Sequence, residues 1–204
     1  MKTQVWAHRG ASAYAPENTL EAFRLAAEMG ADGVELDVQL SRDGELVVAH
    51  DETIDRVSNG TGYIKDYTLA QLKKLSFNRL FPDFKDARIP TLKEVYELLK
   101  PAGLTVNVEL KTGIILYPEI EEKVLAITAS MGMEDRVIYS SFCHPSLVRL
   151  KELDSGLKTG LLYSDGWIDA AAYGRHTVGA DALHPALYHM QDPQLIPAAR
   201  RQGL

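Results

Sequence analysis

Residues 33–40 read Gly-Val-Glu-Leu-Asp-Val-Gln-Leu, an alternation of apolar and polar side chains that predicts a β-strand. One face of this strand carries Glu35, Asp37 and Gln39, and the other face is entirely apolar. The flanking sequence indicates a central strand buried on both sides, where acidic side chains are costly. We therefore expect a functional site on the polar face. The alternative is a strand face that is simply solvated.

A tight turn and a second strand follow directly. Ser41-Arg42-Asp43-Gly44 contains the Asp-Gly pair typical of hairpin turns, and residues 45–50 (Glu-Leu-Val-Val-Ala-His) are predicted to be extended. If the two strands pair as a hairpin, His50 is expected about opposite Asp37 and on the same face. A parallel arrangement would break this pairing, although the strand ends could still converge.

The remaining sequence alternates predicted strands and helices with short connections. Strands are predicted at 3–7, 33–40, 45–50, 104–111, 136–141, 157–163 and 180–184. Helices are predicted at about 18–30, 68–75, 91–100, 118–131, 145–153, 167–174 and 193–202. This alternation favours an α/β fold with a parallel sheet and outer helices, in a single domain spanning 1–204. Residues 51–90 have weak periodicity and are interpreted as an insertion outside the core layers.

Local signals predict where individual helices begin or bend. Asn18, with Glu21 three residues later, is a plausible N-cap for the first long helix, and Thr91 with Glu94 forms a similar capping box. Pro197 lies inside the last predicted helix and is expected to kink or shorten it.

Composition narrows the classes of function. The net charge of −6 argues against a non-specific nucleic-acid binder, which needs a basic surface. A single cysteine, Cys143, excludes an intramolecular disulfide. No apolar run approaches the roughly 20 residues of a membrane span, so no stable membrane anchor is expected. Met1 leads almost directly into the first predicted strand, which leaves no room for a signal peptide, and a cytoplasmic location is expected.

Two predicted strands carry acidic residues at matching places. Glu35 and Asp37 are two residues apart and point the same way, and Glu109 with Lys111 repeats this spacing at the end of the 104–111 strand. Hard oxygen ligands suit Mg²⁺ or Ca²⁺, and the lack of a Cys/His ligand set argues against structural zinc. Glu109 is a candidate third ligand and Lys111 a candidate phosphate contact. The alternative is an ordinary Glu-Lys pair at a strand end.

Two histidines lie where predicted strands end. His8 and His50, near carboxylates and Arg9, favour an acid/base pair, since imidazole titrates near neutral pH. Arg9 offers a bidentate grip on a phosphate, and Gly10 allows the backbone to turn there.

Three further residues are secondary candidates. For Asn18, helix capping is the favoured role. Glu17 is either a further acidic contact to the metal or a residue that orients the ligands. His184 follows a predicted strand and is either structural or part of the pocket lining.

These motifs together resemble one enzyme family. His8-Arg9-Gly10, Pro16-Glu17-Asn18-Thr19, Glu35-x-Asp37, His50-Asp51 and Glu109-x-Lys111 are similar to the motifs of the glycerophosphodiester phosphodiesterases, and the bacterial cytosolic members in particular. The stretches 51–56, 59–62 and 89–92 add to the resemblance.

The resemblance implies a TIM-like (β/α)₈ barrel of the phospholipase-C-like phosphodiesterase type. It implies that Glu35, Asp37 and Glu109 bind one divalent cation, Mg²⁺ or Ca²⁺. His8 and His50 would act as general acid and base, and Arg9 and Lys111 would hold the phosphate. The substrate would be a glycerophosphodiester, hydrolysed to glycerol 3-phosphate and an alcohol.

One departure from the family concerns length. A (β/α)₈ barrel typically needs about 250 residues, whereas this chain has 204. The last strand or strands and a helix are therefore expected to be missing, and a second copy of the chain is one way to complete the open barrel. Two other functions stay open. One is a phospholipase-type enzyme acting on lysolipids. Phe77, Leu80, Phe81 and Phe84 could form its apolar rim, but core packing explains these residues as well. The other is an inactive phosphoester-binding fragment.

Overall fold

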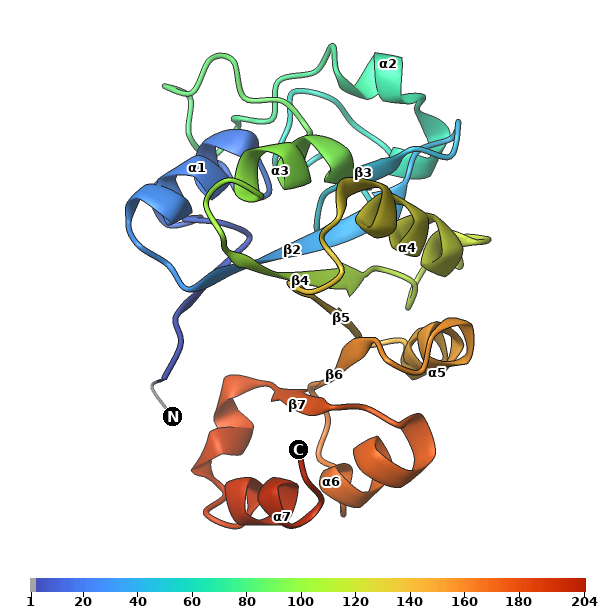
Figure 1. Cartoon of the computed structure of the whole chain (residues 1–204). Coiled ribbons are helices and arrows are strands. Elements are labelled where there is room, and N and C mark those ends of the chain that lie inside the picture. Colours follow the sequence, from blue (N-terminus) through green and yellow to red (C-terminus); the bar gives the residue numbers. More distant parts are fainter. Residues whose placement is uncertain (1–2) are drawn as a thin grey trace.

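A single curved sheet organises the molecule. The structure is a computed structural model and describes residues 3–204. The strands are β1 (Trp6–His8), β2 (Gly33–Leu40), β3 (Leu46–Val48), β4 (Thr105–Leu110), β5 (Val137–Ser141), β6 (Lys158–Tyr163) and β7 (Ala182–Pro185). Their order is β1-β2-β4-β5-β6-β7, with all these pairs parallel, and β3 pairs antiparallel with β2 (Figure 1).

Helices follow the strands in the predicted alternation. The α-helices are α1 (Leu20–Glu28), α2 (Leu69–Leu72), α3 (Leu92–Leu99), α4 (Ile120–Met131), α5 (His144–Leu153), α6 (Ala170–Ala172) and α7 (Leu195–Arg201). Shorter helical turns are η1 (Ile64–Asp66), η2 (Tyr173–Val178, which has π-helical geometry) and η3 (Leu187–Gln191). The predicted α/β class and parallel sheet are confirmed, and most element ends differ from the prediction by a few residues.

The two faces of the sheet differ in chemistry. The side chains that alternate toward α1, α3 and α4 form the main hydrophobic core, for example Leu36, Val38 and Val108, which are fully buried. The opposite, inner face carries polar residues on neighbouring strands. They include Glu35, Asp37, Gln39, Asn107, Glu109, Ser140 and His184. The predicted functional face of β2 is thus the concave inside of the sheet.

The sheet forms a partial barrel. Among residues 3–204, β1 and β7 are the two edge strands of the parallel series and do not pair with one another. Figure 1 shows the strands descending from β2 to β7, with α1, α3 and α4 above the sheet and α5 beside it.

The β2–β3 hairpin forms as predicted, but its register differs by one residue. Val38 pairs with Val48 and Leu40 with Leu46, and the Ala49 amide donates to the Asp37 carbonyl over 3.0 Å. Asp37 therefore lies opposite Ala49, and the expectation that His50 lies opposite Asp37 is wrong. The strand ends at Val48, so His50 leaves the sheet geometry and reaches the site from the segment that follows.

The start of α1 also differs from the prediction. Thr19, not Asn18, caps the helix, and its hydroxyl accepts a hydrogen bond from the Ala22 amide. Asn18 has a φ of 57°, a left-handed conformation that directs its side chain elsewhere. By contrast, the capping box of α3, formed by Thr91 and Glu94, is confirmed.

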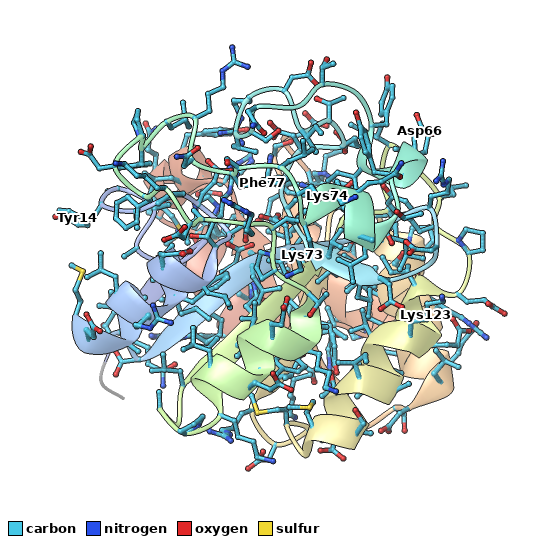
Figure 2. All side chains as sticks on the ribbon, turned by 90° about the horizontal axis from the view of Figure 1, so that it is seen from above. Tyr14, Asp66, Lys73, Lys74, Phe77 and Lys123 are labelled. Atoms are coloured by element: carbon cyan, nitrogen blue, oxygen red, sulfur yellow. The ribbon has the colours of Figure 1, made fainter. Side chains whose placement is uncertain are left out.

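Residues 51–90 form a layer over one end of the sheet. Their apolar side chains make a second, smaller cluster that includes Ile54, Ile64, Leu72 and Phe77. Figure 2 views the molecule from above, so that this segment faces the reader and Asp66, Lys73, Lys74 and Phe77 mark it. Phe77 is only 5% exposed, so it belongs to this cluster and not to an apolar rim.

Two expectations concern the helices. Pro197 lies in the first turn of α7, where its missing N–H costs no helical hydrogen bond, and α7 is shorter than predicted. Every helix within residues 3–204 is too short or too polar to span a bilayer.

Candidate functional site

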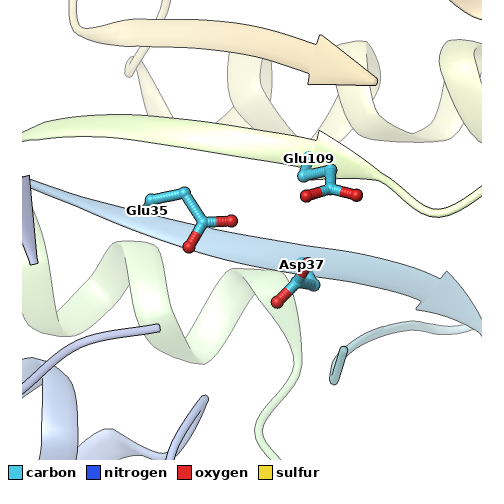
Figure 3. Close-up of side chains that lie close together, drawn as sticks. All are labelled: Glu35, Asp37 and Glu109. Carbon is cyan, nitrogen blue, oxygen red and sulfur yellow. The ribbon is translucent and has the colours of Figure 1, made fainter. Parts of the chain in front are cut away.

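Three carboxylates meet on the inner face of the sheet. Glu35 and Asp37 project from β2, and Glu109 projects from β4 (Figure 3). Asp37 and Glu109 are register partners on these parallel strands, so period two brings Glu35 next to the same spot. One oxygen atom from each carboxylate lies within 4.8 Å of the others. The three residues predicted as metal ligands are therefore brought together.

The electrostatics of this cluster fit a bound cation. Burial raises the pKa of Glu35 well above its ordinary value, and the charges of Asp37 and Glu109 raise it further. Burial and Asp37 raise the pKa of Glu109 to about 7, despite the opposing effect of Lys111. Oδ1 of Asp37 is buried and has no hydrogen-bond partner within residues 3–204. An orphaned carboxylate oxygen among three hard donors matches what Mg²⁺ or Ca²⁺ requires.

Two basic side chains border the cluster. Nζ of Lys111 lies 2.8 Å from Oε1 of Glu109 and 3.8 Å from Oδ1 of Asp37. Nε of Arg9 lies 3.7 Å from Oδ2 of Asp37, and the Arg9 amide donates to Oε2 of Glu35 over 3.0 Å. The three carboxylates can bind a cation, and the two basic side chains beside them can bind the negative charge of a phosphate.

The Arg9 loop depends on its backbone. Arg9 has a φ of 58° and Gly10 a φ of 76°. A Cβ atom on residue 10 would lie 2.7 Å from the Ala22 backbone carbon, so only glycine fits there. A strained non-glycine residue beside the carboxylates is typical of a functional site.

Each predicted histidine has an acidic neighbour, but the two neighbours differ. Nε2 of His8 is 3.8 Å from Oε2 of Glu35, and 68% of the His8 side chain is exposed. Partial desolvation and the Arg9 charge lower the pKa of His8, and the His50 charge acts in the same direction. Nδ1 of His50 lies 2.6 Å from Oδ1 of Asp51. His8 therefore lies beside the cluster of Glu35, Asp37 and Glu109, whereas the ring of His50 is paired with Asp51.

Asn18 and Glu17 occupy different positions. Nδ2 of Asn18 donates to Oδ2 of Asp37 over 2.8 Å, so Asn18 orients a carboxylate of the cluster. Both carboxylate oxygens of Glu17 are bound by the guanidinium groups of Arg9 and Arg56. Glu17 is therefore placed among arginines and not in the acidic cluster, which favours the orienting role over metal contact.

His184 lies on the inner face but outside the cluster. It projects from β7, and β4, β5 and β6 separate that strand from β2. Its ring packs against Gly160, where an added Cβ would collide with it. Burial lowers the pKa of His184, so the ring is a neutral part of the wall.

Sequence reasoning missed one residue that shapes the site. Gln39 is fully buried, and its Nε2 lies 3.0, 3.2 and 2.7 Å from the carbonyl oxygens of Ala49, His50 and Asp51. The hydroxyl of Tyr117 donates to its Oε1 over 2.9 Å, which fixes the orientation of the amide. Gln39 therefore anchors the backbone that carries His50. Its place on the acidic face of β2 was the available signal.

Known proteins share this architecture. The model of the Glycerophosphoryl diester phosphodiesterase family matches residues 8–204. The chain is 47% identical to a glycerophosphodiester phosphodiesterase from Caldanaerobacter subterraneus subsp. tengcongensis, over 100% of this chain and 84% of the relative. It is 42% identical to one from Bacillus altitudinis, over 90% of this chain and 75% of the relative.

Solved structures agree with the sequence comparisons. The crystal structure of a glycerophosphodiester phosphodiesterase from Agrobacterium tumefaciens is 33% identical, with a TM-score of 0.84 over 100% of this chain and 84% of that one. A phosphodiesterase from Oleispira antarctica, in complex with the product sn-glycerol-3-phosphate, is 31% identical, with a TM-score of 0.85 over 98% of this chain and 81% of that one. The chain therefore belongs to the glycerophosphodiester phosphodiesterase family and has a TIM-barrel type of fold.

Proposed function

We propose that this chain hydrolyses glycerophosphodiesters to glycerol 3-phosphate and an alcohol with the help of one divalent cation, Mg²⁺ or Ca²⁺. The observation that carries the proposal is the convergence of Glu35, Asp37 and Glu109, with oxygens within 4.8 Å of one another. Family membership supports it, as does the product bound to the Oleispira antarctica relative.

The carboxylates are the proposed cation ligands. A divalent cation bound there would neutralise charge on the phosphate and lower the pKa of a coordinated hydroxyl or water. Asn18 holds the Asp37 carboxylate through a 2.8 Å hydrogen bond, so the ligands are oriented in advance. Arg9 and Lys111 at the border of the cluster are the proposed phosphate contacts.

His8 and His50 are the proposed proton carriers. One imidazole takes the proton of the nucleophile, which is either water or a hydroxyl of the glycerol, and the other gives a proton to the leaving alkoxide. His8, largely exposed and with a lowered pKa, is mostly neutral near pH 7. This state suits the base, although either assignment is compatible with the placement of the two rings.

The test is an assay of glycerol 3-phosphate release from glycerophosphocholine. The proposal expects release that depends on Mg²⁺ or Ca²⁺ and stops with a chelator. Activity on lysolipids alone would support the phospholipase-type function instead, and binding without turnover would support a phosphoester-binding fragment. Phe77 is buried, so the proposed apolar rim is reduced to Leu80, which is 55% exposed, and the half-buried Phe81 and Phe84. We therefore favour glycerophosphodiesters as the substrates.

Three further expectations stay predictions. These are the single-domain organisation of 1–204 with its insertion at about 51–90, the cytoplasmic location, and completion of the barrel by a second copy. Size-exclusion chromatography with light scattering tests the last of these, because a dimer would double the molar mass.

A further inference from the structure

A chain of charged contacts connects His50 to the first loop of the protein. Oδ1 of Asp51 lies 2.6 Å from Nδ1 of His50, and Oδ2 of the same carboxylate accepts from Nε of Arg56 over 2.6 Å. Nη1 and Nη2 of Arg56 bind the two oxygens of Glu17 over 2.8 and 2.7 Å. Glu17 in turn accepts from Nη1 of Arg9 over 3.0 Å. The order is therefore His50, Asp51, Arg56, Glu17, Arg9.

The geometry makes Arg56 the centre of this chain. All three nitrogens of its guanidinium group donate hydrogen bonds to two carboxylates, and two of them bind Glu17 in a bidentate manner. Arg56 comes from the insertion, whereas Glu17 comes from the loop between β1 and α1. The contact is thus a bridge between the two segments that directly follow His8 and His50 in the sequence.

The chain also selects one tautomer of His50. The Asp51 carboxylate only accepts hydrogen bonds while it is ionised, so Nδ1 of His50 must carry the proton. Burial raises the pKa of Asp51, but hydrogen bonds from Arg56 and His50 outweigh this effect and lower it to about 2. With the proton held on Nδ1, the other ring nitrogen, Nε2, is left to exchange a proton with the substrate.

We infer that Arg56 is a positioning residue for catalysis, which holds Asp51 so that His50 presents Nε2 to the reacting phosphodiester. The inference rests on the proposed function and deepens it. Arg56 itself touches no carboxylate of the Glu35, Asp37 and Glu109 cluster, so it acts through Asp51. Gln39 fixes the His50 backbone, and the Asp51–Arg56 pair fixes the ring.

The ring contact can be observed without turnover. In protein labelled with ¹⁵N-histidine, the strongly hydrogen-bonded Nδ1 proton of His50 should give a downfield NMR signal, identified by its loss in His50→Gln. We expect this signal to vanish in Asp51→Ala and to weaken or shift in Arg56→Ala. An unchanged signal in Arg56→Ala would overturn the inference. Because the NMR measurement needs no substrate, it tests the inference even if the protein proves not to hydrolyse glycerophosphodiesters.

A kinetic comparison tests the consequence for the reaction. Arg56→Ala should lower kcat by about 10- to 100-fold with little change in KM, a loss typical of residues that orient a functional side chain. Arg56→Lys keeps the charge but loses the bidentate grip, so it should recover part of kcat. Equal kcat values for Arg56→Ala and the wild type would contradict the inference.

Lys73→Ala is the matched control. Lys73 also ties the insertion to the scaffold through a 2.5 Å ion pair with Glu94 of α3, and it has no contact with the His50 chain. It should leave both kcat and the NMR signal unchanged. If Arg56→Ala fails to fold, as shown by circular dichroism, the Arg56→Lys and Glu17→Gln variants decide the matter. Wild-type kcat and signal in both would overturn the inference.

Discussion

Asp37 and Glu109 are direct register partners on the parallel strands β2 and β4. Both are buried on the inner face of the sheet, and Oδ1 of Asp37 has no hydrogen-bond partner in the described part of the chain. Two acids in such a position repel one another, since burial weakens the screening of their charges. A cation shared by the two carboxylates would offset this repulsion.

A crystal soaked with Ca²⁺ should contain one ion bonded to Glu35, Asp37 and Glu109. Ca²⁺–oxygen distances of about 2.3–2.6 Å are expected. Asp37→Asn should abolish the density while the fold is retained. Density at another place, with this cluster vacant at a Ca²⁺ concentration that supports activity, would contradict the assigned ligands.

Cation affinity should fall as the pH is lowered through about 7. Protons compete with the cation for carboxylates whose pKa values are raised, and the pKa of Glu109 is raised to about 7. Isothermal titration calorimetry at pH 8 and at pH 6 measures the effect, with proton uptake corrected by using two buffers. Equal affinity at both values would argue that these carboxylates are not the ligands.

The metal-free protein should lose stability as the pH rises. The folded-state pKa of Glu109 is raised above its ordinary value of 4.5, so its contribution is fully present below 4.5 and is lost as the pH passes through about 7. Glu35 acts in the same direction. Urea unfolding of chelator-treated protein at pH 5 and pH 8 measures this loss, and Mg²⁺ or Ca²⁺ should restore stability at pH 8. A metal-free protein that is more stable at pH 8 would show that other groups dominate.

The two histidines should be required for turnover but not for cation binding. His8→Ala and His50→Ala should each lower kcat by about 10²- to 10⁴-fold, the usual contribution of a general acid or base. Calorimetry on the same variants checks that the cation still binds. Near-normal activity in both variants would eliminate the acid/base assignment.

Asn18→Ala should weaken cation binding without disturbing α1. Its side chain orients Asp37 through a 2.8 Å hydrogen bond, whereas Thr19 caps the helix. We expect a loss of about 10-fold or more in affinity. Thr19→Ala is the contrasting variant, and it should reduce stability by about 1 kcal/mol with affinity unchanged. If Asn18→Ala lowered stability and Thr19→Ala lowered cation affinity, Asn18 would be the helix cap after all.

The acidic cluster could be predicted from sequence because it depends on one regular property. Side chains alternate along a strand, so Glu35 and Asp37 must share a face, and the same rule applies to Glu109 on a parallel neighbour. The sheet and most helices followed from similar periodic patterns. Such periodic patterns lie within single strands and helices, so they can be recognised from neighbouring residues alone.

The features that were predicted wrongly or missed depend on single residues or on contacts between residues distant in sequence. A difference of one residue in the hairpin register placed Ala49, not His50, opposite Asp37. The helix cap was predicted at Asn18, but Asn18 has a left-handed backbone conformation and Thr19 caps the helix. The bridge from Arg56 to Glu17 spans 39 residues and two loops, and no periodic pattern reports such a contact.

The most direct test of the account measures glycerol 3-phosphate release by chelator-treated protein as Mg²⁺ or Ca²⁺ is added back, with Asp37→Asn in parallel. The account predicts that glycerophosphocholine turnover is absent without the cation, rises to saturation as one cation binds per chain, and stays absent in Asp37→Asn. Full turnover in the presence of chelator, or unchanged turnover in Asp37→Asn, would contradict it.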